Sequence, residues 1–200
     1  MSELTTLRAI AGLPLEPPSL AASTLILIDC QNTYTHGVME LEGVQAALDE
    51  AALLLDRARS TGIPVIHIQH DDGPGSLYDI TGESGAIVDR VAPRDGEPVV
   101  VKNYPNSFVQ TPLEERLKDV GTENLIIAGF MTHMCVNSTA RGAFNLGYAP
   151  TVVAAATATR SLPGPDPAAP VPASALQAAS LAGIADLFAV VAPDSAAIPS

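Results

Sequence analysis

The segment that most strongly indicates the fold is Asn124-Leu-Ile-Ile-Ala-Gly-Phe-Met-Thr-His-Met-Cys-Val-Asn137. Its continuous apolar run, Leu125 to Ala128, is typical of a strand covered on both faces. Gly129 breaks the strand, and the pattern predicts a helix from Met134 to Leu146. A strand, a glycine turn and a helix in succession indicate an α/β protein.

Cys135 lies in the first turn of that predicted helix. There it would face unpaired backbone N–H groups and the positive end of the helix dipole, which favour the nucleophilic thiolate over the thiol. The alternative is that Cys135 packs as a small buried hydrophobe, as free cysteines often do. This segment alone leaves both interpretations open.

The rest of the chain repeats the strand-then-helix pattern, which predicts an α/β fold of three layers: a six-stranded parallel sheet with helices on both faces. An irregular arm, residues 1–22, precedes a single predicted domain, residues 23–200. The predicted strands are 24–29, 63–68, 97–102, 125–130, 151–155 and 187–191, and the predicted helices are 44–60, 111–120, 134–146 and 173–184.

Composition limits the possible partners. The net charge is −12, and 47% of residues are hydrophobic, so the chain is a folded acidic protein and neither nucleic acid nor an anionic membrane is an expected partner. No apolar run approaches the ~20 residues of a membrane span. With two cysteines and no signal-like N-terminus, we expect a cytoplasmic protein without a disulfide framework.

Three reactive side chains follow three different predicted strands. Asp29 ends the first strand, Lys102 ends the third, and Cys135 follows the fourth by one turn. Ligands of parallel sheets bind beyond the carboxyl ends of the strands. Each residue has a structural alternative, as a turn cap, an extended surface lysine or a packing cysteine. Together they predict a site where the carboxylate takes the thiol proton and the ammonium stabilises both anions.

These segments resemble the isochorismatase-like cysteine hydrolase superfamily, which includes nicotinamidases and N-carbamoylsarcosine amidohydrolases. The resemblance covers about residues 24–192 and implies an isochorismatase-like fold, a small-molecule amide substrate, a homo-oligomer and the catalytic triad Asp29, Lys102 and Cys135. It rests on Leu27-Ile-Asp29-Cys-Gln-Asn32-Thr-Tyr34, Val101-Lys102-Asn-Tyr-Pro-Asn-Ser107-Phe108 and Ala128-Gly129-Phe-Met-Thr132-His-Met-Cys135-Val136.

The resemblance also implies a cis peptide bond between Phe130 and Met131. The backbone N–H groups of Met131 and Cys135 would then form an oxyanion hole for a tetrahedral intermediate. The implied reaction is hydrolysis of a C–N amide or carbamoyl bond through a thioester on Cys135.

No cofactor is expected. Nicotinamidases of this superfamily bind a metal through an Asp-x-His and a later His after the second strand, and the corresponding stretch here, His67-Ile-Gln-His70-Asp71-Asp72-Gly73, does not reproduce that set. His70 with Asp71 or Asp72 could still bind a metal, but a site needs three or four ligands. We expect His70 or Gln69 to line the substrate pocket, and His67, in mid-strand, to be a core residue.

Further pocket residues are predicted from their position beside the three reactive side chains. Tyr34 and Phe108 are candidate apolar walls, with ordinary core packing as the alternative. His133, next to the nucleophile, is expected to face the pocket or a neighbouring subunit. Cys30 is expected to be inert packing.

Two other functions remain open from the sequence. A vinyl ether hydrolase of the isochorismate type needs an acid but no thiol, so Cys135 argues against it. A non-catalytic binding protein could keep the fold and lose the chemistry. The long loop 69–96 and the proline-rich loop 161–172 are expected to shape the pocket, and the substrate itself is not specified.

Overall fold

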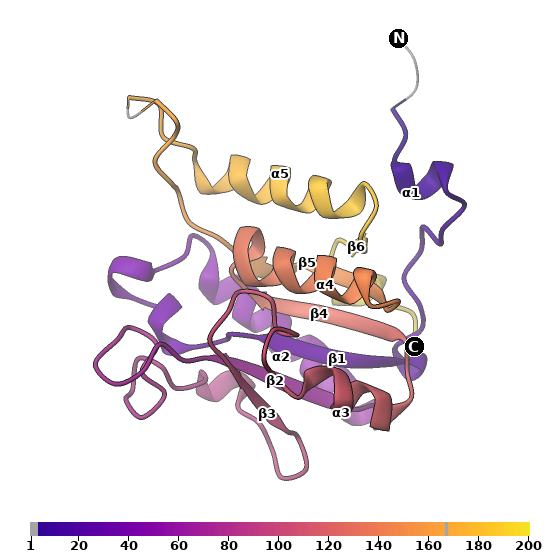
Figure 1. The fold of residues 1–200 in the computed structure, drawn as a ribbon, viewed down its shortest axis with the longest axis horizontal. Helices are drawn as coiled ribbons and strands as arrows, with labels where there is room; N and C mark the ends of the chain where they lie inside the picture. The colour runs from indigo at the N-terminus through magenta and orange to yellow at the C-terminus, as the bar shows by residue number, and fades with distance from the viewer. Residues whose placement is uncertain (1–3, 167) are drawn as a thin grey trace.

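A six-stranded, all-parallel sheet forms the centre of the molecule (Figure 1). The computed structural model describes residues 4–166 and 168–200. The strand order is β3-β2-β1-β4-β5-β6, which confirms the predicted sheet. The strands are β1 Ser23–Ile28, β2 Val65–His70, β3 Val99–Lys102, β4 Asn124–Phe130, β5 Ala149–Ala158 and β6 Val190–Ala192.

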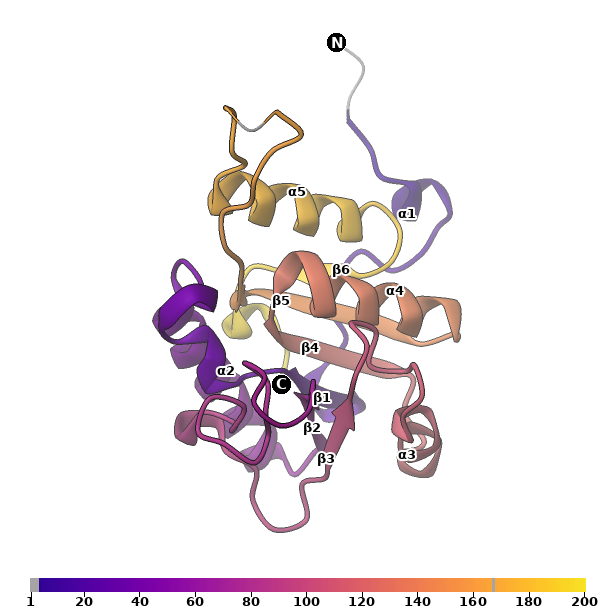
Figure 2. The same cartoon turned by 60° about the vertical axis from the view of Figure 1, so that its left-hand side comes forward.

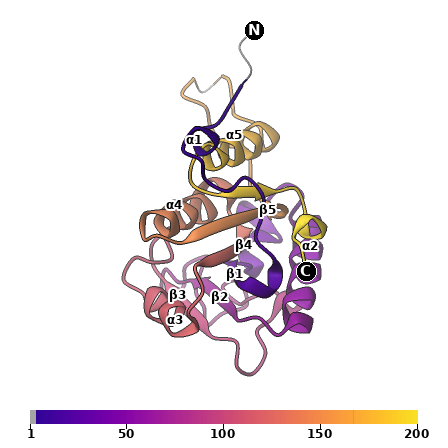
Figure 3. The same cartoon turned by 90° about the vertical axis from the view of Figure 1, so that its right-hand side faces the viewer.

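Helices cover both faces of the sheet, with α2 on one side and α3 and α4 on the other (Figure 3). Helix α5 packs beside α4. The helices are α1 Leu7–Ile10, α2 Val44–Thr61, α3 Leu113–Val120, α4 Asn137–Asn145 and α5 Ala173–Ala185. In the part of the chain that the structure describes, no helix has the length and apolar character needed to cross a membrane.

The apolar runs are continuous because alternate residues of one strand enter opposite cores. In β1, Leu25 and Leu27 pack in the cluster that contains α2, whereas Ile26 and Ile28 pack in the cluster that contains α3 and α4. Side chains of a strand point alternately to the two faces, so a strand covered on both sides needs an apolar residue at every position.

Helix α2 begins and ends close to its predicted bounds. Its buried face has the three- and four-residue spacing of an amphipathic helix. Gly62, with φ of 75°, ends it in the left-handed conformation that glycine adopts without penalty. The buried residues are those expected from the sequence: Val44, Ala47, Leu48, Ala51, Leu54, Leu55 and Ala58.

The structure differs from the sequence prediction at the termini of several elements. The predicted helix 134–146 is a π-helical turn, Thr132–Val136, followed by α4. Strand β5 extends to Ala158 past a register shift against β4. The N-terminal arm contains α1, anchored by the buried Arg8 guanidinium, which donates to carbonyl oxygens of Pro14 and Leu187. These features depend on tertiary contacts that local patterns do not encode.

The order of the strands places a switch point between β1 and β4, from which the chain winds outward in both directions. Open α/β sheets bind ligands beyond the carboxyl ends of the strands at such a point. Chain segments that follow β2 and β5 lie on the left of Figure 1, the side that comes forward in Figure 2.

Candidate active site

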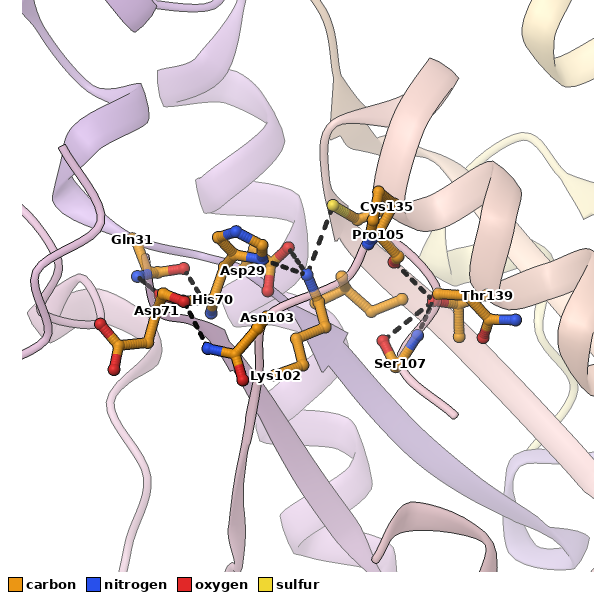
Figure 4. Close-up of polar contacts among 12 residues, drawn as sticks. Asp29, Gln31, His70, Asp71, Lys102, Asn103, Pro105, Ser107, Cys135 and Thr139 are labelled. Atoms are coloured by element: carbon orange, nitrogen blue, oxygen red, sulfur yellow. Dashed lines mark hydrogen bonds and ion pairs between the residues drawn. The ribbon is translucent and has the colours of Figure 1, made fainter. Parts of the chain in front are cut away.

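Four neighbouring strands bring four polar side chains together at the switch point (Figure 4). Asp29 follows β1, His70 ends β2, Lys102 ends β3, and Cys135 lies in the turn after β4. Because β3, β2, β1 and β4 are adjacent in the sheet, these positions share one edge. The three residues predicted as a triad therefore meet, and His70 joins them.

Lys102 is the centre of this group. Its Nζ lies 2.7 Å from Asp29 Oδ2, 3.0 Å from His70 Nδ1 and 3.4 Å from Cys135 Sγ. The contacts with His70 and Cys135 are hydrogen bonds, and the contact with Asp29 is a close ion pair. With Nδ1 accepting from Lys102, His70 carries its proton on Nε2 and donates it to Asp72 Oδ1, 3.1 Å away.

Asp29 is held at the bottom of the site by an unusual backbone conformation. Its φ is 50°, in the left-handed region that aspartate tolerates better than most residues, and its N–H donates to Ile68 O. Burial raises the pKa of the Asp29 carboxyl group, while the Lys102 charge and hydrogen bonds from Lys102 and Cys135 act in the opposite direction.

Cys135 differs electrostatically from the sequence expectation of a thiolate at a helix N-terminus. It lies in the π-helical turn, before α4 begins, and is 5% exposed. Burial raises the pKa of the thiol, and the negative charge of Asp29 raises it further; Lys102 only partly offsets this. A raised pKa favours the thiol over the nucleophilic thiolate, so attack by the sulfur calls for a base beside it.

The backbone beside Cys135 has the predicted cis peptide bond between Phe130 and Met131. Gly129, at φ of 116°, precedes it and lies against β1: a Cβ there would stand 2.0 Å from Ile28 O. Within the described chain, the N–H of Met131 donates to no other group. Met131 and Cys135 are both among the residues that line a cavity at this point.

A cavity of about 210 Å³ opens over the sulfur of Cys135. Tyr34 and Tyr78 contact each other edge to face, at 5.8 Å between ring centroids, and Tyr78 makes a similar contact with His70 at 4.9 Å. The walls are Tyr34, His70, Tyr78, Pro105, Met131 and Met134. The pocket is thus mainly aromatic and thioether surface, with the polar group at its base.

Three residues expected to line the pocket lie outside its walls. Phe108 stacks on Tyr148, at 5.9 Å between centroids, in the core under α3 and α4. Gln69 donates from Nε2 to Gly85 O and supports the long loop. His133 Nδ1 is 2.6 Å from Thr159 Oγ1. Adjacency in sequence did not determine the direction of these side chains.

Sequence reasoning missed one positioning residue and three pocket walls. Gln31 is fully buried; its Nε2 donates to His70 O and Gly85 O, and its Oε1 accepts from His70 N. It therefore fixes the end of β2 against the long loop. The available signal was its place in the motif Asp29-Cys-Gln-Asn32. Tyr78 and Pro105 come from loops whose path the sequence did not give, and Met134 comes from the π-helical turn that sequence patterns did not predict.

The metal site considered at His70 has too few ligands in this structure. His70 Nε2 contacts Asp72, and within residues 4–166 and 168–200 no group of three or more His, Cys, Asp or Glu side chains is placed to hold an ion. His67 is buried in the core, where it contacts Glu97. Cys30 is also buried, and burial raises the pKa of its thiol.

The family of the chain follows from this fold and site together with its relatives. The family model described as the isochorismatase domain matches residues 23–193. The crystal structure of an isochorismatase from Pseudomonas putida KT2440 is similar with a TM-score of 0.94 and 38% identity, over 98% of this chain and 100% of that one. The chain belongs to the isochorismatase family of hydrolases.

Two curated relatives show the range of this family. The secreted isochorismatase effector Isc1 of Verticillium dahliae is 32% identical over 92% of this chain and 95% of its own length. Ureidoacrylate amidohydrolase RutB of Stutzerimonas stutzeri is 30% identical over 71% of this chain and 73% of its own. Because the first is named as secreted, membership of the family does not fix the cellular compartment.

Proposed function

We propose that this protein is a cysteine amidohydrolase that cleaves a C–N bond of a small molecule through a thioester on Cys135. The observation that carries the proposal is the position of Lys102, which contacts both Asp29 and the sulfur beneath the cavity. A raised thiol pKa with a carboxylate beside it matches general-base activation of a nucleophile. The similarity to a ureidoacrylate amidohydrolase supports the same reaction class.

In the first half of the reaction, ionised Asp29 takes the proton of Cys135. The sulfur attacks the amide carbon, and the carbonyl oxygen becomes an oxyanion that accepts a hydrogen bond from the Met131 N–H. Protonated Asp29 then donates its proton to the departing nitrogen, so ammonia or an amine leaves and a thioester remains. Lys102 contacts both the carboxylate and the sulfur and keeps the two groups close to each other throughout this half of the reaction.

In the second half, water enters where the amine left. Asp29 takes a proton from the water as the water oxygen attacks the thioester carbon. The tetrahedral intermediate collapses with cleavage of the C–S bond, and the thiolate recovers its proton from Asp29. The products are a carboxylic acid and the resting thiol, so one carboxyl group serves as base and acid in turn.

The alternative with support is a vinyl ether hydrolase, because two of the similar proteins are named isochorismatases. That reaction needs protonated Asp29 as an acid and makes no bond to sulfur. The two reactions therefore differ in their need for Cys135. Isochorismate also carries two carboxylates, for which the described walls of the cavity provide no cation.

The test is a panel of primary amides and ureido compounds assayed for ammonia, with isochorismate assayed in parallel for pyruvate. We expect ammonia release by the wild type and a loss of at least ~1,000-fold in Cys135→Ala, since no other group can form the covalent intermediate. Mass spectrometry of quenched reactions should show an acyl adduct on Cys135. Full turnover by Cys135→Ala would disprove the assignment.

A further inference from the structure

The active-site cavity discriminates between substrates by charge. We infer that the group attached to the scissile amide is small, uncharged and apolar or aromatic, and that carboxylate-bearing amides are excluded. This inference rests on the proposed function for the reaction itself. It depends on three features of the site: the contacts that already surround the Lys102 ammonium, the lack of an unpaired cation at the described walls of the cavity, and the apolar character of those walls.

Lys102 is the only cationic side chain near the base of the cavity in the described structure, and three groups already surround its ammonium. It forms a close ion pair with Asp29 and hydrogen bonds with Cys135 and His70. The residue is 1% exposed. A substrate carboxylate could approach the Lys102 ammonium only by displacing one of these three groups, and the proposed reaction needs two of them, Asp29 and Cys135.

The cavity offers an anion no unpaired cation. The Asp29 carboxylate beneath it already pairs with Lys102, and Asp72, half-exposed, lies at the far side of His70. A carboxylate entering this site would lose its hydration without gaining a cationic partner, and Asp72 would repel it.

Arg160 is the one other cation that follows a strand on this edge among the described residues. It comes two residues after the end of β5, and its Nε is buried without a hydrogen-bond partner. Burial lowers the pKa of the His133 imidazole, and the Arg160 charge lowers it further. Arg160 is not among the walls of the cavity, and we therefore assign it no role in substrate binding.

The shape and surface of the cavity favour a compact neutral group. Its volume of about 210 Å³ lies below the ~300–1,000 Å³ of pockets for drug-sized ligands. Tyr34 and Tyr78 present ring surface, and Met131 and Met134 present thioethers, which adapt to irregular apolar shapes. An alkyl or aryl substituent would replace water on all of these surfaces.

The first experiment measures charge selection without requiring turnover. Iodoacetamide and iodoacetate alkylate thiols by the same displacement and differ mainly in charge. Rates at Cys135 would be measured by intact mass and peptide mapping, with 2-mercaptoethanol as the reference thiol and Cys135→Ala as the blank. We expect the rate ratio of iodoacetamide to iodoacetate to exceed the reference ratio by at least ~10-fold, because only the anion would lose hydration without gaining a cationic partner.

The second experiment compares three amides of matched chain length: pentanamide, 4-aminobutanamide and succinamate. We expect kcat/KM for pentanamide to exceed that for succinamate by at least ~100-fold, the effect of a desolvated, unpaired carboxylate. Equal or faster turnover of succinamate would overturn the inference. If no amide is hydrolysed, the proposed function fails, whereas the alkylation ratio still tests the charge selection independently.

A variant pair controls for overall charge. Met134→Lys places a cation in the cavity wall, at a residue that is 39% exposed, whereas Leu53→Lys adds the same charge on the exposed surface of α2. We expect Met134→Lys to bring the alkylation ratio toward that of the reference thiol and Leu53→Lys to leave it unchanged. Equal effects of the two variants would show that the charge selection does not arise in the cavity. Failure of both reagents to alkylate Cys135 would show that the cavity does not give access to the sulfur, which would also overturn the inference.

Discussion

The ammonium of Lys102 and the carboxylate of Asp29 are 2.7 Å apart, and neither side chain is exposed to solvent. Removing two charges from water costs several kcal/mol per ion, which their attraction offsets only with good geometry and further hydrogen bonds. The pair therefore contributes little net stability. The proposed chemistry gives a reason for keeping the pair: Asp29 acts as the base for the Cys135 thiol, and Lys102 positions both groups.

Replacement of one member of the pair should destabilise the protein strongly. Lys102→Met leaves Asp29 buried without its counter-ion, and we expect a loss of about 3–5 kcal/mol in the free energy of unfolding. Urea denaturation at neutral pH measures this change. Amide hydrolysis should fall to the level of Cys135→Ala.

The double variant Asp29→Asn, Lys102→Met is the matched control, because it removes both charges and keeps the volume. We expect its stability to return to within about 1 kcal/mol of the wild type or to exceed it, with no recovery of activity. A double variant as unstable as the single one would show that the pair itself holds the fold together.

The reactivity of Cys135 should depend on pH through Asp29. Burial raises the Asp29 pKa, so the carboxylate needed as a base is lost as pH falls through a value above the ordinary ~3.9. We expect the rate of iodoacetamide alkylation at Cys135 to increase as the pH rises through the raised pKa of Asp29. In Asp29→Asn that step should disappear, leaving only the ionisation of the thiol at high pH. An unchanged acid limb in the variant would show that another group is the base.

A second polar cluster should control stability in acid. Glu97 accepts two hydrogen bonds from the Arg59 guanidinium and contacts buried His67, and Arg59 lowers the pKa of Glu97 to about 2. Burial lowers the pKa of His67. A lowered carboxyl pKa stabilises the folded state above the unfolded value and loses this effect as pH falls toward 2. A lowered histidine pKa likewise costs stability once pH falls below its unfolded value.

We therefore expect the free energy of unfolding to decline from about pH 6.5 downward. Glu97→Gln should lose about 1–3 kcal/mol at pH 7, and its stability should vary less than that of the wild type between about pH 4.5 and 2. Thermal unfolding across this range measures both effects. Parallel stability curves for the two proteins would rule out Glu97 as the source.

Gly129 should tolerate no side chain. A Cβ there would stand 2.0 Å from Ile28 O, on the strand that carries Asp29, and backbone at φ of 116° is poorly accessible to other residues. We expect Gly129→Ala to abolish soluble expression or to lower the free energy of unfolding by more than 3 kcal/mol, roughly the larger effects of single substitutions. Gly121→Ala, also at positive φ but with no atom within 4 Å, should cost only about 1–2 kcal/mol.

Much of the architecture was predictable because the elements have strong local signals. Strand β1 is apolar at every position, and α2 has a buried stripe at helical spacing that ends at Gly62. The bounds of β5 and β6 and the turn before α4 were not predictable, because a register shift and a π-helical turn depend on partners distant in the sequence.

The sequence by itself placed Asp29, Lys102 and Cys135 after three strands, because hydrophobic periodicity shows where strands end. Only the tertiary structure put β3, β2, β1 and β4 side by side and so added His70 to the group and closed aromatic walls over the sulfur. The tertiary structure also determines the direction in which the pKa of the Cys135 thiol shifts. Burial and the neighbouring carboxylate outweigh the local effect of a turn, since charge in a desolvated site depends on every group packed around it.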